Sequence, residues 1–211
     1  VSPGAGKGGQ MTVSHPRRPA HPKRRRPLRR LFALALLAAV CFLFGPTLLE
    51  RVTYKLEYRD LIEHYSIEQG LDPALVASMI YNESRFNPSA VSRVGARGLM
   101  QIMPETGAWL AGKFGEAANY TPDRLFDVNT NLRYGCWYLG YLARTFGGDV
   151  VKMAAGYHAG QGRVAEWLKD PAISPDGRTL PVERIPYPDT KQYVERVVKT
   201  HAIYRKLYWE N

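Results

Sequence analysis

Hydrophobic residues recur along residues 50–211 at the three- and four-residue spacing of amphipathic helices, as in "LVASMIYNES" at residues 75–84. No stretch alternates apolar and polar residues for long enough to indicate a substantial sheet. Internal repeats are absent. The pattern therefore predicts an all-α fold, with one compact helical domain over residues 50–211.

Proline, glycine and capping residues divide this domain into helices. Asp72 followed by Pro73 predicts a helix start, and Gly70 and Gly147 are typical of helix ends. Asp149 is expected to cap "VVKMAAGYHAG". Helices are expected over residues 52–69 and 73–84, from Pro104, in "TPDRLFD" capped by Thr121, from Asn129 or Asn131 to Phe146, from Val150, from Gly162, and from Asp189 or Thr190, with an irregular Pro-rich connector over residues 170–188.

Residues 31–49 form an uninterrupted uncharged run, "LFALALLAAVCFLFGPTLL", directly preceded by "KRRRPLRR". About 20 apolar residues cross a bilayer as a helix, and basic flanks stay on the cytoplasmic side. The run predicts a transmembrane anchor, with the N-terminus inside and the domain outside the cytoplasmic membrane. A cleaved signal peptide is the alternative, but its apolar core is shorter and a small-x-small cleavage site would follow.

The formal net charge of +10 belongs to the N-terminal tail. Residues 1–49 hold nine Lys or Arg and no acid, which leaves 20 of the 29 basic residues beside 19 acidic ones. A nucleic-acid-binding face is therefore not expected on the domain, and no protein partner is identifiable. We expect residues 1–30 to be a disordered cytoplasmic tail, with translation starting at Met11 after a Gly-rich stretch whose codons resemble a ribosome-binding site.

The two cysteines cannot form a disulfide within the domain, because Cys41 lies in the apolar run and Cys136 is alone in the rest of the chain. Aromatic and apolar neighbours indicate that Cys136 is a small core residue. The five histidines show no paired ligand spacing. Neither a metal site nor another cofactor is predicted.

Glu83 is the residue whose place in the pattern is unusual. On a helical wheel at about 100° per residue, it falls at about 80° from Leu75, between Met79 and Val76 on the apolar stripe. Burial and a place in the last helical turn both raise the pKa of a carboxyl group. Glu83 would then stay protonated near neutral pH and could donate a proton to a leaving oxygen. The alternative is a glutamate that reaches water from a fraying helix end.

Four segments in order resemble the signature of the soluble lytic transglycosylase family, and the similarity spans about residues 58–205. They are Glu83-Ser84, Gly98 to Gln101, Tyr157 to Gly160, and "IPYPDTKQYVERV" with Tyr193. The resemblance implies a goose-type lysozyme-like fold and cleavage of bacterial peptidoglycan, whose glycan strands would be the partner of the domain.

The family implies a mechanism with one glutamate, Glu83 in this chain. It would act as acid and then as base on the β-1,4 bond between N-acetylmuramic acid and N-acetylglucosamine, leaving 1,6-anhydromuramyl ends. By analogy, the substrate-binding residues are Ser84 and Gln101 as hydrogen-bonding groups, Met100 as an apolar wall, and Tyr157 and Tyr193 lining the cleft and orienting Glu83 or the sugar.

One departure concerns the residue after Tyr157, where the family has Asn and this chain has His158. Because imidazole titrates near pH 6.5, His158 is expected to make activity depend on pH between about 5 and 8.

Two rival functions stay open at this point. A hydrolytic muramidase on the same fold would need a second carboxylate, for which the chain offers Asp60, Glu105, Asp123, Asp127 and Glu166. The other rival is an inactive glycan-binding module, against which the intact Glu83, Ser84 and Gln101 argue.

Overall fold

The structure is a computed structural model that describes residues 1, 2, 4 and 26–210. Of the tail expected to be disordered over residues 1–30, residues 3 and 5–25 lie outside the described part, as does the expected start at Met11, and residues 26–30 are helical. The chain divides into two units, residues 1–48 and residues 49–211.

The first unit contains most of helix α1 (Arg26–Thr53), which includes residues 31–49. Its described side chains are largely exposed and apolar, among them Phe32 and Phe42 at 73% and 82% exposure. Across the described part of the chain, none of the helices combines the length and the apolar character that a membrane crossing demands. The predicted transmembrane segment, which needs about 20 predominantly apolar residues in one helix, is therefore not supported.

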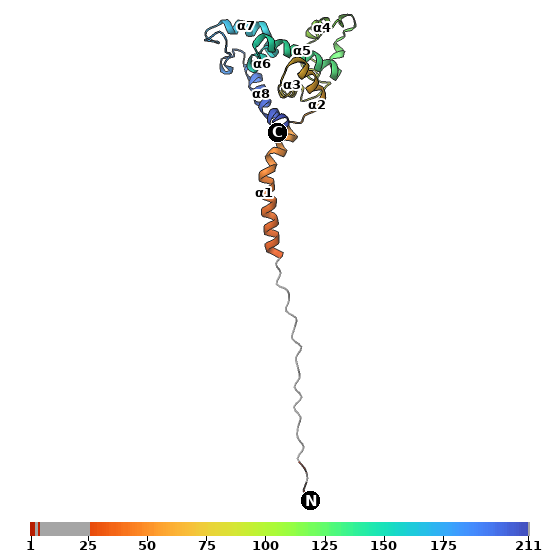
Figure 1. The fold of residues 1–211 in the computed structure, drawn as a ribbon, viewed down its shortest axis with the longest axis vertical. Coiled ribbons are helices and arrows are strands. Elements are labelled where there is room, and N and C mark those ends of the chain that lie inside the picture. The colour runs from red at the N-terminus through yellow and green to blue at the C-terminus, as the bar shows by residue number, and fades with distance from the viewer. Residues whose placement is uncertain (3, 5–25, 211) are drawn as a thin grey trace. The chain divides into compact units, whose positions relative to one another are not determined.

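Helices joined by loops make up the described residues of the second unit, as predicted. Two isolated bridges, Val91 with Arg97 and Arg97 with Ile102, are the β-type pairings there. The α-helices are α2 (Arg59–Gln69), α3 (Pro73–Ser84), α4 (Pro104–Lys113), α5 (Val128–Phe146), α6 (Val150–Ala159), α7 (Gln161–Lys169) and α8 (Pro188–Tyr204) (Figure 1). Short 3₁₀ turns cover Ala117–Asn119, Pro122–Phe126 and Val182–Arg184, and a π-helical turn, Arg205–Trp209, follows α8.

Local capping chemistry sets several helix ends as the sequence predicts. The Asp72 carboxylate accepts the Ala74 N–H at 2.9 Å at the start of α3, and Asp149 accepts the Lys152 N–H at 3.0 Å at the start of α6. Gly147 ends α5 in the left-handed conformation.

Other boundaries differ from the prediction. The helix expected over residues 52–69 is interrupted, because Tyr58 adopts a left-handed backbone with φ 55° just before α2. Asp127, rather than Asn129 or Asn131, caps α5 by accepting the Thr130 N–H at 2.8 Å. Helix α7 begins at Gln161, one residue before Gly162. Helix α8 begins at Pro188, since proline fits the first helical position.

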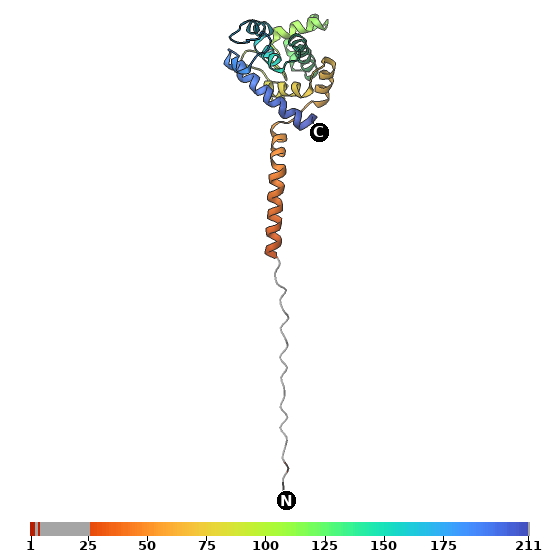
Figure 2. The same ribbon diagram turned by 60° about the vertical axis from the view of Figure 1, so that its left-hand side comes forward.

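Helix α3 is the most enclosed element of this unit. Every residue from Ala74 to Tyr81 is buried. Helix α8 packs along α3 and also against α6, and in Figure 2 it crosses beside α3 in blue. The end of α3 therefore lies where α6 and α8 can both deliver side chains.

Candidate active site

Glu83 lies in the last turn of α3, two residues after the buried run that ends at Tyr81. The chain then turns sharply, because Arg85 and Phe86 both have left-handed backbones with φ 54° and 64°. The carboxylate is partly buried, and its Oε1 accepts a hydrogen bond of 2.6 Å from the Tyr193 hydroxyl of α8. This contact argues against the alternative in which Glu83 sits at a fraying helix end and reaches only water.

The environment raises the pKa of Glu83 to about 7, chiefly because burial disfavours the charged carboxylate. The Tyr193 hydrogen bond and the positive charge of Arg196 lower this pKa and offset part of the effect of burial. The raised pKa that the sequence predicts is thus found. A group that titrates near the working pH can both give and take a proton.

Tyr193 is buried beside Glu83, and its hydroxyl also lies 3.5 Å from the Met79 sulfur. Burial, followed by the nearby Glu83 charge and hydrogen bond, holds the pKa of Tyr193 well above its ordinary value. The phenol therefore remains protonated and acts as a donor to Glu83. The sequence proposed Tyr193 for this orienting role through the family resemblance.

Substitution of Tyr193 by phenylalanine should move the alkaline limb of the activity profile to higher pH. The lost hydrogen bond stabilises the ionised carboxylate, so its removal raises the pKa of Glu83 and keeps the acid protonated further into the alkaline range. We also expect kcat to fall about 10-fold, or about 1.4 kcal/mol, because Glu83 loses its orienting contact. Activity against pH measures both effects.

Tyr204→Phe is the matched control, because its buried hydroxyl on the same helix donates to the Lys55 carbonyl at 3.0 Å instead. An alkaline limb that stays in place in Tyr193→Phe, or that moves equally in Tyr204→Phe, contradicts the orienting role.

Ser84 and Gln101 brace the loop that follows α3. The Ser84 hydroxyl is 2.7 Å from the Leu99 carbonyl and 3.3 Å from the Ile80 carbonyl. Gln101, with φ 47°, donates its side-chain amide to the carbonyls of Ala90 at 3.1 Å and Gly98 at 2.9 Å. The Ser84 hydroxyl and the Gln101 amide N–H groups are therefore used to hold the backbone of this loop. Either residue could bond to the glycan, as expected, only by accepting a hydrogen bond at its side-chain oxygen.

Met100 belongs to the core. Its side chain has no exposed surface, and its sulfur lies against Gly135 so closely that a Cβ there would be 2.1 Å from it. The apolar cleft wall expected of this residue is therefore not formed by its side chain. Its backbone does contribute, because the Met100 carbonyl accepts the Tyr157 hydroxyl at 2.8 Å.

Asn131, which the sequence suggested only as a helix start, is buried and binds the backbone of the same loop through its side chain. Its amide donates to the carbonyls of Arg97 at 3.0 Å and Leu125 at 2.7 Å, and its oxygen accepts the Met100 N–H at 2.8 Å. Gly98 allows this approach, since a Cβ there would lie 2.1 Å from the Leu125 carbonyl. The sequence did contain a signal for this role, because Asn131 is a polar amide on the face of α5 that also carries the buried Gly135 and Leu139.

Tyr157 and His158 reach the site from the end of α6. Burial and then the Glu83 charge raise the pKa of Tyr157 well above its ordinary value, so its hydroxyl stays a donor to the loop. The His158 ring is tilted against the Tyr193 ring, with 4.7 Å between centroids, and its Nδ1 is 3.0 Å from the Thr190 hydroxyl. The structure thus brings Tyr157, His158 and Tyr193 together with Glu83.

His158→Asn should change only the acid limb of the activity profile. Burial, and then the positive charge of Arg196, hold the pKa of His158 below its ordinary value near 6.5. The ring is therefore neutral above about pH 6.5, and the pH dependence expected between about 5 and 8 narrows to the acid end. We expect kcat/KM above that pH to show the same slope in both proteins. A shifted alkaline limb in the variant would contradict this assignment.

A cavity of about 190 Å³ lies beside Tyr157. It is lined by Gln101, Ile102, Met103, Thr106, Leu110, Tyr138, Tyr157 and Gly160. Thr106 and Tyr138 were not singled out by the sequence, because nothing in a local pattern distinguishes them from ordinary helix residues. The cavity places apolar and hydroxyl groups next to the loop that Glu83 adjoins.

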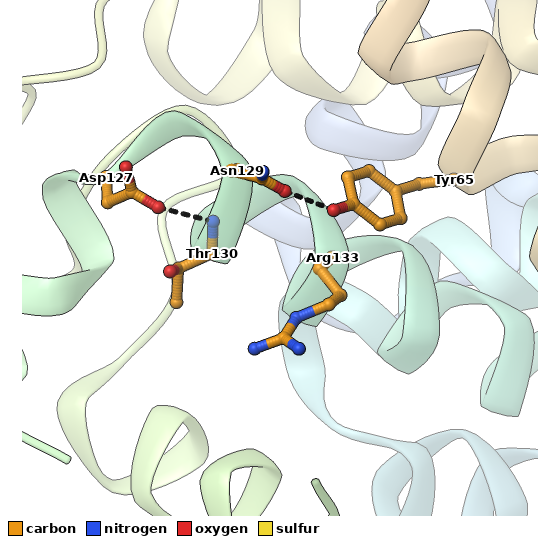
Figure 3. Close-up of a pocket in the computed structure, with 5 residues that line it drawn as sticks. All are labelled: Tyr65, Asp127, Asn129, Thr130 and Arg133. Atoms are coloured by element: carbon orange, nitrogen blue, oxygen red, sulfur yellow. Dashed lines mark hydrogen bonds between the residues drawn. The ribbon is translucent and has the colours of Figure 1, made fainter. Parts of the chain in front are cut away.

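Another cavity, at the start of α5, is separate from these residues (Figure 3). The Tyr65 hydroxyl bonds to Asn129, and Asp127 accepts the Thr130 N–H within it. Arg133 is paired with Glu116 at 2.6 Å. These polar groups already satisfy one another, as in a structural contact.

No second carboxylate among the described residues acts on the pKa of Glu83. Asp60 and Glu105 are exposed in the first turns of α2 and α4, and Asp127 caps α5. Asp123 pairs with Arg97 at 2.5 Å, and Glu166 pairs with Arg163 at 3.0 Å. The described residues also contain no group of three or more His, Cys, Asp or Glu side chains that could hold a metal ion.

Comparison with known proteins gives one family. The model of the transglycosylase SLT domain matches residues 60–176. The soluble lytic murein transglycosylase of Escherichia coli K12 is 36% identical over 72% of this chain, and the match covers 23% of that protein. The membrane-bound lytic murein transglycosylase C of Edwardsiella ictaluri is 29% identical over 85% of this chain and 55% of that protein.

A solved structure agrees with these sequences. The 70 kDa soluble lytic transglycosylase of Escherichia coli superposes with a TM-score of 0.69 at 33% identity, over 76% of this chain and 26% of that one. The chain therefore spans only about a quarter of the length of the soluble relatives it matches.

Proposed function

The chain belongs to the lytic transglycosylase family of the transglycosylase SLT domain, with its lysozyme-like fold, and on that premise we propose that it cleaves peptidoglycan. The bond cleaved is the β-1,4 link between N-acetylmuramic acid and N-acetylglucosamine. The observation that carries the proposal is the partly buried Glu83, whose pKa is raised to about 7 and whose carboxylate is oriented by Tyr193.

Glu83 acts twice in the proposed reaction. Protonated, it gives its proton to the bridging oxygen as the bond from that oxygen to C1 of the muramic acid breaks. The substrate's own N-acetyl group stabilises the positive charge that develops at C1. The Glu83 carboxylate then takes the proton of the C6 hydroxyl as that oxygen bonds to C1. The product is a 1,6-anhydromuramyl end, no water is consumed, and Glu83 is protonated again.

The structural roles of the other candidate carboxylates favour this reaction over hydrolysis. Glycosidases that use two carboxylates hold them roughly 5–9.5 Å apart across the scissile bond. Asp127 caps α5, and Asp123 and Glu166 pair with Arg97 and Arg163, so these carboxylates already have structural partners. A muramidase with a water held by a second acid is therefore the less favoured activity.

Product analysis separates the two reactions. Purified sacculi are digested with the full-length protein, and the soluble fragments are analysed by mass spectrometry. Transglycosylation yields anhydromuramyl ends, and hydrolysis yields reducing ends heavier by one water. Reducing ends as the main product would overturn the proposed reaction.

We also propose that α1 associates with the cytoplasmic membrane and keeps the domain on its outer side, where peptidoglycan lies. The support is the exposed apolar surface of α1, together with the membrane-bound protein among the relatives. Leu36 and Leu37 are exposed, and the double substitution Leu36→Asp and Leu37→Asp should release the protein from vesicles. Each charged residue costs roughly 3 kcal/mol at the centre of a helix embedded in a membrane. Wild-type protein that fails to float with vesicles contradicts this proposal.

A further inference from the structure

A third cavity adjoins the one beside Tyr157. Its volume is about 330 Å³, at the lower end of the ~300–1,000 Å³ typical of small-molecule sites. Glu105, Thr106, Trp109, Tyr138 and Gln161 line it. Thr106 and Tyr138 line both cavities, so the two cavities are neighbours that share these side chains.

Trp109 lines the cavity of about 330 Å³ but not the one beside Tyr157, and it is 42% exposed. It is held in place by edge-on contacts to three rings, with centroids 5.4 Å from Trp137, 6.2 Å from Tyr138 and 6.1 Å from Tyr141. Tyr138 in turn lies 5.5 Å from Tyr157. The indole is thus fixed by its neighbours, with Lys113 Nζ 5.4 Å from its ring centre, and it remains partly exposed at the end of an aromatic row that reaches Tyr157.

The chemistry of the lining matches a sugar ring. A pyranose has an apolar C–H face that stacks on an aromatic ring, and hydroxyl and acetamido groups around its rim that need hydrogen-bond partners. Trp109 and Tyr138 supply the aromatic surface. Glu105, Thr106 and Gln161 are polar and accessible, the first exposed and the others partly so.

We propose that Trp109, with Tyr138 and the polar side chains around it, is an additional binding subsite for a sugar unit of the glycan strand, remote from the scissile bond. The inference rests on the proposed function for the identity of the glycan. Its structural basis is the pair of cavities that share Thr106 and Tyr138, together with the fixed, exposed indole. The subsite would lengthen the stretch of strand that the domain holds.

The test measures glycan binding directly. Peptide-free glycan strand fragments of increasing length are titrated by calorimetry into full-length Glu83→Gln protein, with and without Trp109→Ala. We expect Trp109→Ala to weaken binding of long fragments about 3- to 10-fold, which corresponds to one aromatic contact of ~0.5–1.5 kcal/mol. Binding of the shortest fragments should be unchanged. Trp109→Phe should restore most of the affinity, because it keeps an aromatic face.

Ile67→Ala is the control, since it removes a large exposed side chain, 77% exposed, that lines neither cavity. In the active protein, Trp109→Ala should raise KM for long strands and leave kcat unchanged. Equal affinities of Trp109→Ala and its parent for every fragment, or no glycan binding at all, would overturn the subsite. Glycan binding without any cleavage by wild type would overturn the proposed function instead, and the affinities would still decide the subsite.

Discussion

Glu83→Gln should lose at least about 10³-fold in kcat on peptidoglycan, because general acid and base catalysis contributes roughly 10²–10⁴-fold and Glu83 is assigned both roles. Glutamine has nearly the same shape and still presents an oxygen to the Tyr193 hydroxyl. The substitution therefore removes the proton and leaves the contact. The release of soluble fragments from sacculi measures the loss.

The melting temperature of Glu83→Gln serves as a folding control, and the direction of its change follows from the raised pKa of Glu83. Glu83 titrates at about 7 in the folded protein, above its ordinary 4.5, so the folded state holds the proton more tightly than the unfolded state. Its contribution to stability is then greatest below about pH 4.5 and falls as pH rises to about 7. Glutamine does not ionise, so Glu83→Gln should melt at the same temperature as wild type or higher at pH 8.

A stable Glu83→Gln protein that still lyses sacculi at the wild-type rate would contradict the catalytic assignment. Inactive protein with a lowered melting temperature at pH 8 would instead contradict the account of the buried carboxyl. A binding module without activity predicts that wild type and variant release equally little.

Asn131→Ala is expected to be the most damaging substitution for stability, by about 3–5 kcal/mol. It removes three hydrogen bonds at once and leaves the Met100 N–H and the carbonyls of Arg97 and Leu125 buried without that partner. Each buried polar group left unpaired costs roughly 1–3 kcal/mol. Since domains are stable by only about 5–15 kcal/mol, this loss is a large share of the total. Chemical denaturation of the full chain measures it.

Asn129→Ala is the matched control on the same helix. Asn129 is exposed and bonds only to the Tyr65 hydroxyl, so its loss should cost about 1 kcal/mol or less. Equal destabilisation by the two substitutions would show that Asn131 does not brace the loop. We also expect activity in Asn131→Ala to fall further than its folded fraction, because the loop that Ser84 and Tyr157 also hold lies beside Glu83.

The sequence by itself determined what local physics controls. Asp72-Pro73 and Asp149 start their helices because capping needs only a carboxylate two or three residues from a free N–H. The unusual position of Glu83 is also local, since 3.6 residues per turn alone places it on the apolar stripe of α3. Where a left-handed residue intervenes, as at Tyr58, the same periodicity extended the predicted helix too far.

Only the tertiary structure decided which groups meet. Tyr193 lies 110 residues from Glu83 in the chain, and their hydrogen bond exists because α8 packs along α3. Periodicity shows that a face is buried but not which element covers it. For the same reason, Met100 was expected in the cleft and lies in the core, while Asn131 was expected at a helix start and braces the loop. Trp109, exposed and yet fixed by three rings from α5, has a position that packing alone determines.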